Sequence, residues 1–286
     1  MSAVDTLPVR PAPVSTRFLR SELGMVFRRR RNQVLLAVLA AIPVIIAVAI
    51  KVTTPSAEDA EGGGPPFLFQ ISGNGIFVAL TSLAVVLPLF LPLAVAVVAG
   101  ESIAGEASIG TLRYLLVVPV SRARLLAVKY AGAVAYCVVA ALLVAAVGVG
   151  MGALLFPVGP VTLLSGSTVP YATGLVRLLL VALYVAAMMA GLAAIGLFVS
   201  TLTESAIAAM ATTAVLAVTS EVLDSVPQLD WLGPYLFSHY WLNFGDLLRD
   251  PVSTEGPLRG LLVTAAYVLV FGSLAWSRMT TKDVSS

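Results

Sequence analysis

Long apolar runs separated by short polar segments make up almost all of the chain after Gln33. The hydrocarbon core of a bilayer is about 30 Å thick, so a helix needs roughly 20 apolar residues to cross it. Six runs come near that length, at about residues 34–52, 75–99, 126–156, 174–200, 205–223 and 259–277. The pattern predicts an all-α membrane protein in which residues 34–286 form one domain with six transmembrane helices.

The fifth run is the shortest of the six. It has 16 uncharged residues between Glu204 and Glu221, which is about 24 Å of helix and barely enough to span. The residues that follow, 226–251, mix aromatic side chains with glycine, proline and acids, a composition typical of the headgroup level. We therefore expect short helices that cover the outer face before the last span. His239, the only histidine, is expected to be a hydrogen-bonded residue of this region.

A different pattern precedes the first run. Leucine, valine and phenylalanine recur at helical spacing, while arginine, serine and glycine fill the opposite face. This spacing predicts an amphipathic helix over residues 15–33 that lies in the membrane interface with its cations near anionic headgroups. An unstructured basic segment is the alternative. The expected interfacial anchors are Arg28, Arg29, Arg30 and Arg31. Residues 1–14 contain three prolines and are expected to be a disordered cytoplasmic tail.

The distribution of basic residues predicts the orientation. Thirteen of the 17 Lys and Arg residues lie in the N-terminal segment, in the loop after the second run and in the C-terminal tail. Loops rich in Lys and Arg stay in the cytoplasm. Both termini are therefore expected to be cytoplasmic in a multi-pass protein of the plasma membrane. The long polar lead and the length of the first apolar run favour a retained helix over a cleaved signal peptide.

Composition narrows the classes of function. Hydrophobic residues make up 59% of the chain and charged residues 11%, whereas soluble domains have about 45–50% apolar residues. The net charge of +2 gives no indication of nucleic acid as a partner. The single cysteine, Cys137, excludes a disulfide within the chain and a cysteine metal site, and is expected to be a small buried hydrophobe. No metal site is predicted.

The predicted spans contain almost no ionisable residues. Glu101, Lys129 and Arg177 fall near span ends, where long side chains reach the headgroups. A transporter driven by protons or sodium normally needs a buried carboxylate or an unwound helix pair, and the chain has no phosphate-binding loop of the Gly-x-x-x-x-Gly-Lys-Ser/Thr type. We therefore expect the free energy for any uphill transport to come from another chain.

The loop between the second and third runs, at residues 101–124, carries charge and helix boundaries together. Gly110 precedes Thr111, which can cap a short helix from Leu112 to Val118. Pro119 ends that helix because the residue before a proline avoids the helical region. Ser121 can then cap the third span. The product is a rigid cytoplasmic helix parallel to the membrane, shaped to lie in a groove of another protein. An ordinary helix–turn–helix connector is the alternative.

The residues of this loop resemble the hallmark of permease subunits of the ATP-binding-cassette type-2 transporter family. The matching positions are Glu106, Gly110, Thr111, Leu112, Leu115, Leu116, Pro119, Val120, Ser121, Arg122 and Lys129. The C-terminal residues 281–284 are also similar to the ending of that family, and the six-span layout extends the resemblance over residues 15–286. Where the family often has charges before Gly-Thr, this chain has Ala107-Ser108-Ile109.

The resemblance implies an elbow helix at residues 15–33, a coupling helix in the loop and short extracellular helices before the last span. It also implies a permease subunit of an ATP-driven exporter, in which two permease copies, identical or related, form the path and separate ATPase subunits bind ATP and Mg. This chain would hold no cofactor and no catalytic residue. The residues implied to couple to the ATPase are Glu101, Glu106, Gly110, Thr111, Leu112, Arg113, Leu116, Pro119, Ser121 and Arg122.

Two other classes of function are kept open. One is a passive channel or membrane scaffold that needs no ATPase. The other is an interfacial membrane enzyme that uses His239 with Asp246. The spacing of Gly148 and Gly152 permits close helix packing, either within one chain or between two copies. A few residues of the fourth and fifth runs are candidates for a cavity lining, although packing is the simpler interpretation; they are Tyr184, Met188, Met189, Thr212 and Thr213.

Overall fold

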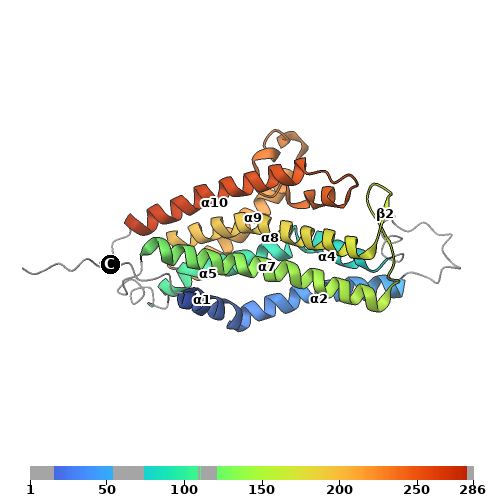
Figure 1. Cartoon of the computed structure of the whole chain (residues 1–286). Coiled ribbons are helices and arrows are strands. Elements are labelled where there is room, and N and C mark those ends of the chain that lie inside the picture. Colours follow the sequence, from blue (N-terminus) through green and yellow to red (C-terminus); the bar gives the residue numbers. More distant parts are fainter. Residues whose placement is uncertain (1–15, 54–73, 109, 111–120, 282–286) are drawn as a thin grey trace, which may run out of the picture.

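The computed structural model describes residues 16–53, 74–108, 110 and 121–281, and these form an elongated helical bundle (Figure 1). The long helices are α2 (Arg30–Thr53), α5 (Phe90–Ser108), α7 (Arg122–Leu155), α8 (Tyr171–Leu202), α9 (Ala206–Asp224) and α10 (Glu255–Thr281). All six are long and apolar enough to cross a membrane. The prediction of an all-α membrane protein with six candidate spans is confirmed.

Two shorter helices complete the bundle. Helix α1 (Thr16–Arg28) precedes α2, and α4 (Ile76–Val86) precedes α5. The sequence pattern predicts α4 and α5 as one span, but a turn at residues 87–89 divides it. Pro88 lies in that turn, where its missing N–H and its ring disfavour a continuous helix. Helix α9 has 19 residues, about 28 Å. Ser205 caps its N-terminus, because its side chain accepts a hydrogen bond from the Ala208 N–H at 3.3 Å.

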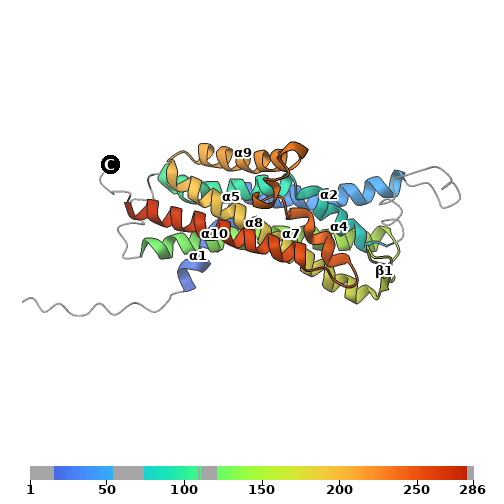
Figure 2. The ribbon, with the colours of Figure 1, turned by 90° about the horizontal axis from the view of Figure 1, so that it is seen from above.

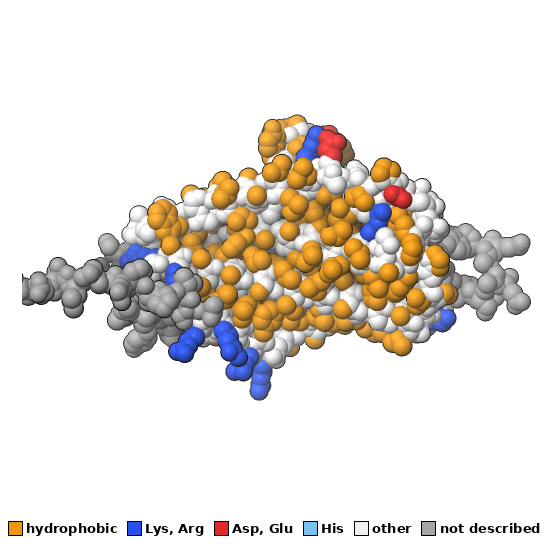
Figure 3. Space-filling model, viewed as in Figure 1, with side chains coloured by type: hydrophobic (Ala, Val, Ile, Leu, Met, Phe, Trp, Pro, Cys, Tyr) orange, Lys and Arg blue, Asp and Glu red, His pale blue; other side chains and the backbone are white. Residues whose placement is uncertain are grey.

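Helices α5 and α8 form the centre of the bundle. Within the most apolar 18-residue stretch of each span, 67% of the residues of α5 and 72% of those of α8 are buried, against 17–33% in the other four spans. Helix α8 contacts α5, α7, α9 and α10, and Figure 2 shows α9 along one edge of the bundle and α10 nearer the other. The outer helices therefore present apolar side chains outward, which cover much of the visible face in Figure 3.

Glycines let α4 and α7 approach closely. A Cβ at Gly148 would lie 2.5 Å from the Cα of Ala79, and one at Gly152 would collide with the backbone of Gly75. The small-residue spacing of Gly148 and Gly152 is thus used within the chain. Cys137 is fully buried, as predicted. Of the candidate cavity residues, four are packed in the interior, and these are Tyr184, Met188, Met189 and Thr213.

The end of the bundle away from α1 is covered by short elements. A hairpin of β1 (Val161–Thr162) and β2 (Thr168–Val169) joins α7 to α8, and the hydrophobic pattern does not predict it. The expected short helices before the last span are present as the 3-10 helices η1 (Pro227–Leu229), η2 (Gly233–Tyr235) and η3 (Trp241–Leu248). His239 is hydrogen-bonded as predicted, through Nδ1 to Asp224 Oδ1 at 2.6 Å.

The first described helix and the end of the last one lie toward the same end of the molecule. Helix α1 packs against α7, and the guanidinium of Arg122, the first residue of α7, donates to the Thr280 carbonyl of α10 at 3.1 Å. The ends of α1 and α10 therefore share a side, as an even number of crossings requires, and Lys and Arg gather there in Figure 3. The predicted tail at residues 1–14 and the predicted coupling helix at residues 112–118 lie outside the described residues.

Candidate functional site

The junction between α1 and α2 is fixed by two side-chain amides. Asn32 Nδ2 donates to the Val26 carbonyl at 2.8 Å, and Gln33 Nε2 donates to the Phe27 carbonyl at 3.0 Å. The last carbonyls of a helix have no partner within the helix, so these amides satisfy the end of α1 where the chain turns into α2. Asn32 is buried. The direction in which α1 leaves the membrane-spanning bundle is therefore set by the sequence of α2.

A buried ion-pair group joins α1, α5 and α7. Lys129 Nζ of α7 lies 3.1 Å from both carboxylate oxygens of Glu22 on α1 and also binds the carboxylate of Glu106 on α5. The side chains of Lys129, Glu22 and Glu106 are 3%, 5% and 10% exposed. Gly132 makes room, because a Cβ there would lie 3.3 Å from Glu22 Cγ. Three helices are held together by one ammonium group.

This geometry corrects the expectation for Lys129. The sequence placed it near a span end, where a lysine reaches the headgroups, but in the structure its ammonium points into the bundle. A charge removed from water needs close partners of opposite sign, and the two glutamates supply them. Glu22 was not among the predicted site residues. One signal was available, because Glu22 is the single acid of α1 and lies four residues before Val26, on the face that packs against the bundle.

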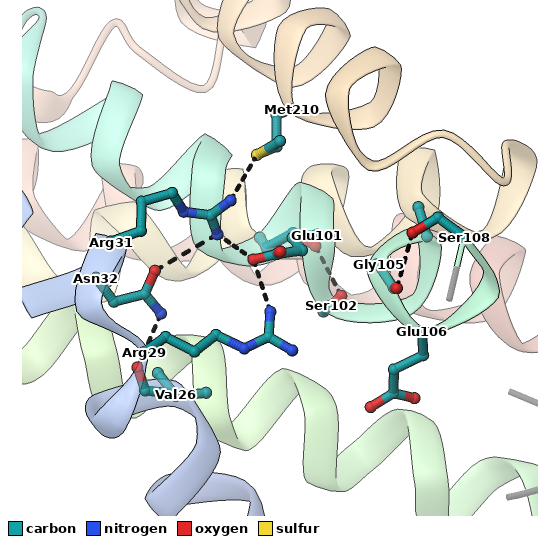
Figure 4. A network of polar contacts seen from close by, with 12 residues as sticks. Val26, Arg29, Arg31, Asn32, Glu101, Ser102, Gly105, Glu106, Ser108 and Met210 are labelled. Carbon is teal, nitrogen blue, oxygen red and sulfur yellow. Dashed lines mark hydrogen bonds and ion pairs between the residues drawn. The ribbon is translucent and has the colours of Figure 1, made fainter. Parts of the chain in front are cut away.

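A second ion-pair group lies beside the first. Glu101 of α5 accepts from Arg29 Nη1 at 2.7 Å and from Arg31, and Figure 4 shows its carboxylate between the two guanidinium groups. Arg31 also donates to Met210 Sδ of α9 at 3.4 Å. A side chain at Gly105 would lie 2.5 Å from Glu101 Cγ. The start of α2 is thereby tied to α5 and to α9.

The two groups enclose a small polar cavity of about 20 Å³, enough for about one water molecule. Its polar lining residues are Glu22, Arg29, Asn32, Glu101, Ser102 and Lys129. Because the cavity touches both groups, we treat them as one site, the α1 charge cluster. Its members are Glu22, Arg29, Arg31, Glu101, Glu106 and Lys129.

The four arginines predicted as interfacial anchors divide into two kinds. Arg29 and Arg31 bind Glu101, although their side chains remain 38% and 39% exposed. Arg28 and Arg30 are exposed and form no ion pair with another described residue. Two of the four therefore have a structural role inside the chain, and two face outward.

The α1 charge cluster flanks the predicted coupling segment on both sides. Glu106 lies two residues before the end of α5, and Gly110 follows with a positive φ of 74°. On the other side, Ser121 caps α7 as predicted, accepting from the Arg124 N–H at 3.3 Å. The other predicted coupling residues, Thr111, Leu112, Arg113, Leu116 and Pro119, lie outside the described residues. Glu101 and Glu106 bind residues of their own chain and do not face outward.

Ser200 of α8 adds a neutral link near this cluster. Its buried hydroxyl accepts from the backbone N–H groups of Ile103 and Ala104 on α5, at 3.0 and 2.8 Å. The cytoplasm-side half of α5, in the predicted orientation, is thus held by charged residues on one side and by a serine on the other. Sequence periodicity gave no signal for this contact, because a serine in an apolar helix more often bonds to its own backbone.

The residues suggested for an interfacial enzyme are not brought together. His239 binds Asp224, whereas Asp246 faces Arg249 Nε at 3.1 Å. Among the described residues, no group of three or more His, Cys, Asp or Glu side chains is placed to hold a metal ion.

Comparison with known proteins gives one family. No curated protein sequence matches this chain. Residues 36–285 match a family described as "Protein of unknown function (DUF2705)". The match covers α2 from residue 36 and the five later candidate spans in full, and of the α1 charge cluster it includes Glu101, Glu106 and Lys129. Because the match covers far more than half of the sequence, this chain belongs to the DUF2705 family.

Proposed function

We propose that this protein is the permease subunit of an ATP-driven exporter and that a separate ATPase subunit binds the segment between α5 and α7. The family description names no activity, so the proposal rests on residues. One observation carries it. The two helices that enter and leave the segment are locked to each other and to α1 by Lys129, which binds Glu106 on one side and Glu22 on the other.

The mechanical argument follows from that arrangement. A partner that pushes on the segment at residues 109–120 acts on Ser108 at the end of α5 and on Ser121 at the start of α7. Because a buried ion pair is expensive to break, α1, α5 and α7 would move as one body. Helix α5 is also in contact with α8 and α9, so the displacement would reach the centre of the bundle. ATP and Mg would be held by the partner, with no cofactor in this chain.

The remaining parts of the proposal concern location and assembly. The basic end that carries α1 would face the cytoplasm, with both termini inside and the chain in the plasma membrane. Helices α5 and α8 fill the centre of one bundle, so a transport path would lie at an interface between two copies. Two permease copies, identical or related, would therefore form the path. The outward direction of transport follows from the family resemblance of the loop.

The enzyme alternative receives no support from the side chains it would use, because His239 and Asp246 each bind a different partner. A passive channel or scaffold would need no ATPase. The experiment must therefore ask whether an ATPase is bound and controlled by the segment next to the α1 charge cluster.

The test uses the full chain, purified in detergent from its native host together with any bound protein that carries a phosphate-binding loop. Gly110→Val changes a position at φ 74°, a conformation that L side chains rarely adopt. We expect this variant to fold normally. The rate of ATP hydrolysis by the complex should fall about tenfold or more, which corresponds to about 1.4 kcal/mol of coupling free energy.

Gly150→Val is the matched control, because a Cβ at Gly150 meets nothing within 4 Å. It should leave ATP hydrolysis and melting temperature unchanged. The proposal fails if the chain performs its transport in vesicles without nucleotide, or if Gly110→Val retains full ATP-dependent activity in a complex that is otherwise intact.

A further inference from the structure

The two faces of α1 have different partners. The inner face packs against the bundle, where Val26 is buried, the Phe27 ring stacks on Tyr136 with centroids 6.2 Å apart, and Glu22 binds Lys129. An amphipathic helix at a membrane usually inserts its apolar face into lipid. Here protein already covers much of that face, so α1 is held on the bundle, with its other face outward.

The outward face of α1 is a stripe of positive charge. Arg17, Arg20, Gly24 and Arg28 follow one another at intervals of three and four residues, which places them on one side of the helix. The three arginines are exposed and form no ion pair with other described residues. The single acid of the helix, Glu22, points the other way. The charge of this face is therefore uncompensated within the described part of the chain.

Gly24 leaves a gap in the middle of the stripe. A Cβ at this position would meet nothing within 4 Å, so the glycine is not required by packing. In a helix it costs about 1 kcal/mol relative to alanine. Together with Arg17, Arg20, Arg28, Ser21, Met25 and Arg29, it lines a broad, mostly open hollow on this side of the helix. An anionic group in that hollow could reach the helix backbone between Arg20 and Arg28.

We propose that α1 binds the headgroup of an anionic phospholipid, with the phosphate above Gly24 and between Arg20 and Arg28, and with Arg17 at the edge. Arginine is suited to this role because its planar guanidinium forms two parallel hydrogen bonds to a phosphate. The candidate membrane span α2 begins directly after Arg29. The outer face of α1 therefore lies close to the adjoining leaflet, whose lipids carry the nearest anionic groups. This proposal does not depend on an ATPase partner.

The test measures how many phosphatidylglycerol and phosphatidylcholine molecules the purified full chain retains in mixed micelles, by native mass spectrometry. A basic residue near an anionic membrane surface contributes about fivefold in affinity, so Arg20→Gln with Arg28→Gln should weaken phosphatidylglycerol retention about thirtyfold. Retention of phosphatidylcholine should not change. Arg278→Gln is the control, because Arg278 is an exposed basic residue at the end of α10, and it should have little effect.

A second variant keeps every charge. Gly24→Leu fills the gap above the backbone, and we expect it to lose most of the preference for phosphatidylglycerol while keeping the parent melting temperature. Equal retention in the parent and the double arginine variant would overturn the proposal, and so would an equally large loss in Arg278→Gln. Glycerol phosphate in solution should compete poorly; if it displaced the lipid at millimolar concentration, the hollow would be a site for free anions and not for a lipid.

Discussion

Lys129 offers the sharpest test of the α1 charge cluster, because its ammonium is the one cation between two buried carboxylates. Lys129→Met removes the charge with an unbranched side chain that is one heavy atom shorter. Glu22 and Glu106 would then lie together in a site that is at most 10% exposed. Removal of one partner from a buried ion pair costs about 3–5 kcal/mol. At about 2–4 °C per kcal/mol, this loss lowers the melting temperature by about 6–20 °C.

Two further variants should lose less stability than Lys129→Met. Glu22→Met leaves Lys129 with Glu106, a neutral pair, so its loss should be clearly smaller than that of Lys129→Met. The triple variant in which Glu22, Glu106 and Lys129 are all methionine removes every charge together. Well-packed apolar residues of similar volume often replace a buried ion group without loss, and methionine adapts to irregular space. We expect the triple variant to unfold within about 2 kcal/mol of the parent.

The assay is thermal unfolding of the purified chain in a mild detergent, followed by intrinsic tryptophan fluorescence. Lys51→Met is the matched control, because Lys51 is exposed at the far end of α2 and its nearest described interaction is a Phe156 ring at 5.9 Å. The reasoning is refuted if Lys129→Met unfolds at the parent temperature. It is also refuted if the triple variant is as unstable as Lys129→Met, because the loss would then come from packing and not from unpaired charge.

Three further predictions concern other contacts. Glu101→Gln should cost only about 1 kcal/mol or less, because the arginines that bind it are more than a third exposed and screened by solvent; a larger loss in a melting experiment would contradict this. Gly148→Leu should lower the melting temperature by several degrees through overlap with Ala79, whereas Gly150→Leu should not; a folded Gly148→Leu protein with an altered oligomeric state would mean that the glycine acts between copies. His239→Ala and Asp224→Asn should each cost about 1 kcal/mol, and the double variant no more than either, as measured by a double-mutant cycle.

Hydrophobic patterning predicted the spans well because a membrane imposes a length and a polarity that each helix must meet alone. Burial of polar groups depends on which faces meet, and one sequence does not contain that information directly. Thus the pattern ended the second span at residue 99, whereas α5 continues to Ser108, and it started the third span at residue 126, whereas α7 begins at Arg122. It also placed Lys129 at the headgroups. In the structure, Gly132 leaves space for the Glu22 side chain inside the bundle, and the buried Glu22 carboxylate binds the Lys129 ammonium there.

The break between α4 and α5 shows a related limit. Pro88 and Pro92 are visible in the sequence as helix-disrupting residues, but a proline in a membrane helix is often tolerated with only a kink. Here Pro92 lies in the first turn of α5, where a missing N–H has no cost, and Pro88 lies in the turn itself. The two prolines together favour a new helix start over a kink. The hairpin β1–β2 has two residues in each strand, too few for a period-two pattern to be recognised.

Helix α1 connects the separate predictions and also lets experiments distinguish them. Its inner face carries Glu22, whose partner is Lys129, and its outer face carries Arg20 and Arg28, which have no partner among the described residues. Changes at sites without shared partners are additive. Loss of the inner contact should therefore lower stability without changing lipid preference, and loss of the outer arginines should do the reverse. If Arg20→Gln with Arg28→Gln lowered the melting temperature as much as Lys129→Met, the helix would be held on the bundle by its outer charges, and the division of α1 into two faces would be wrong.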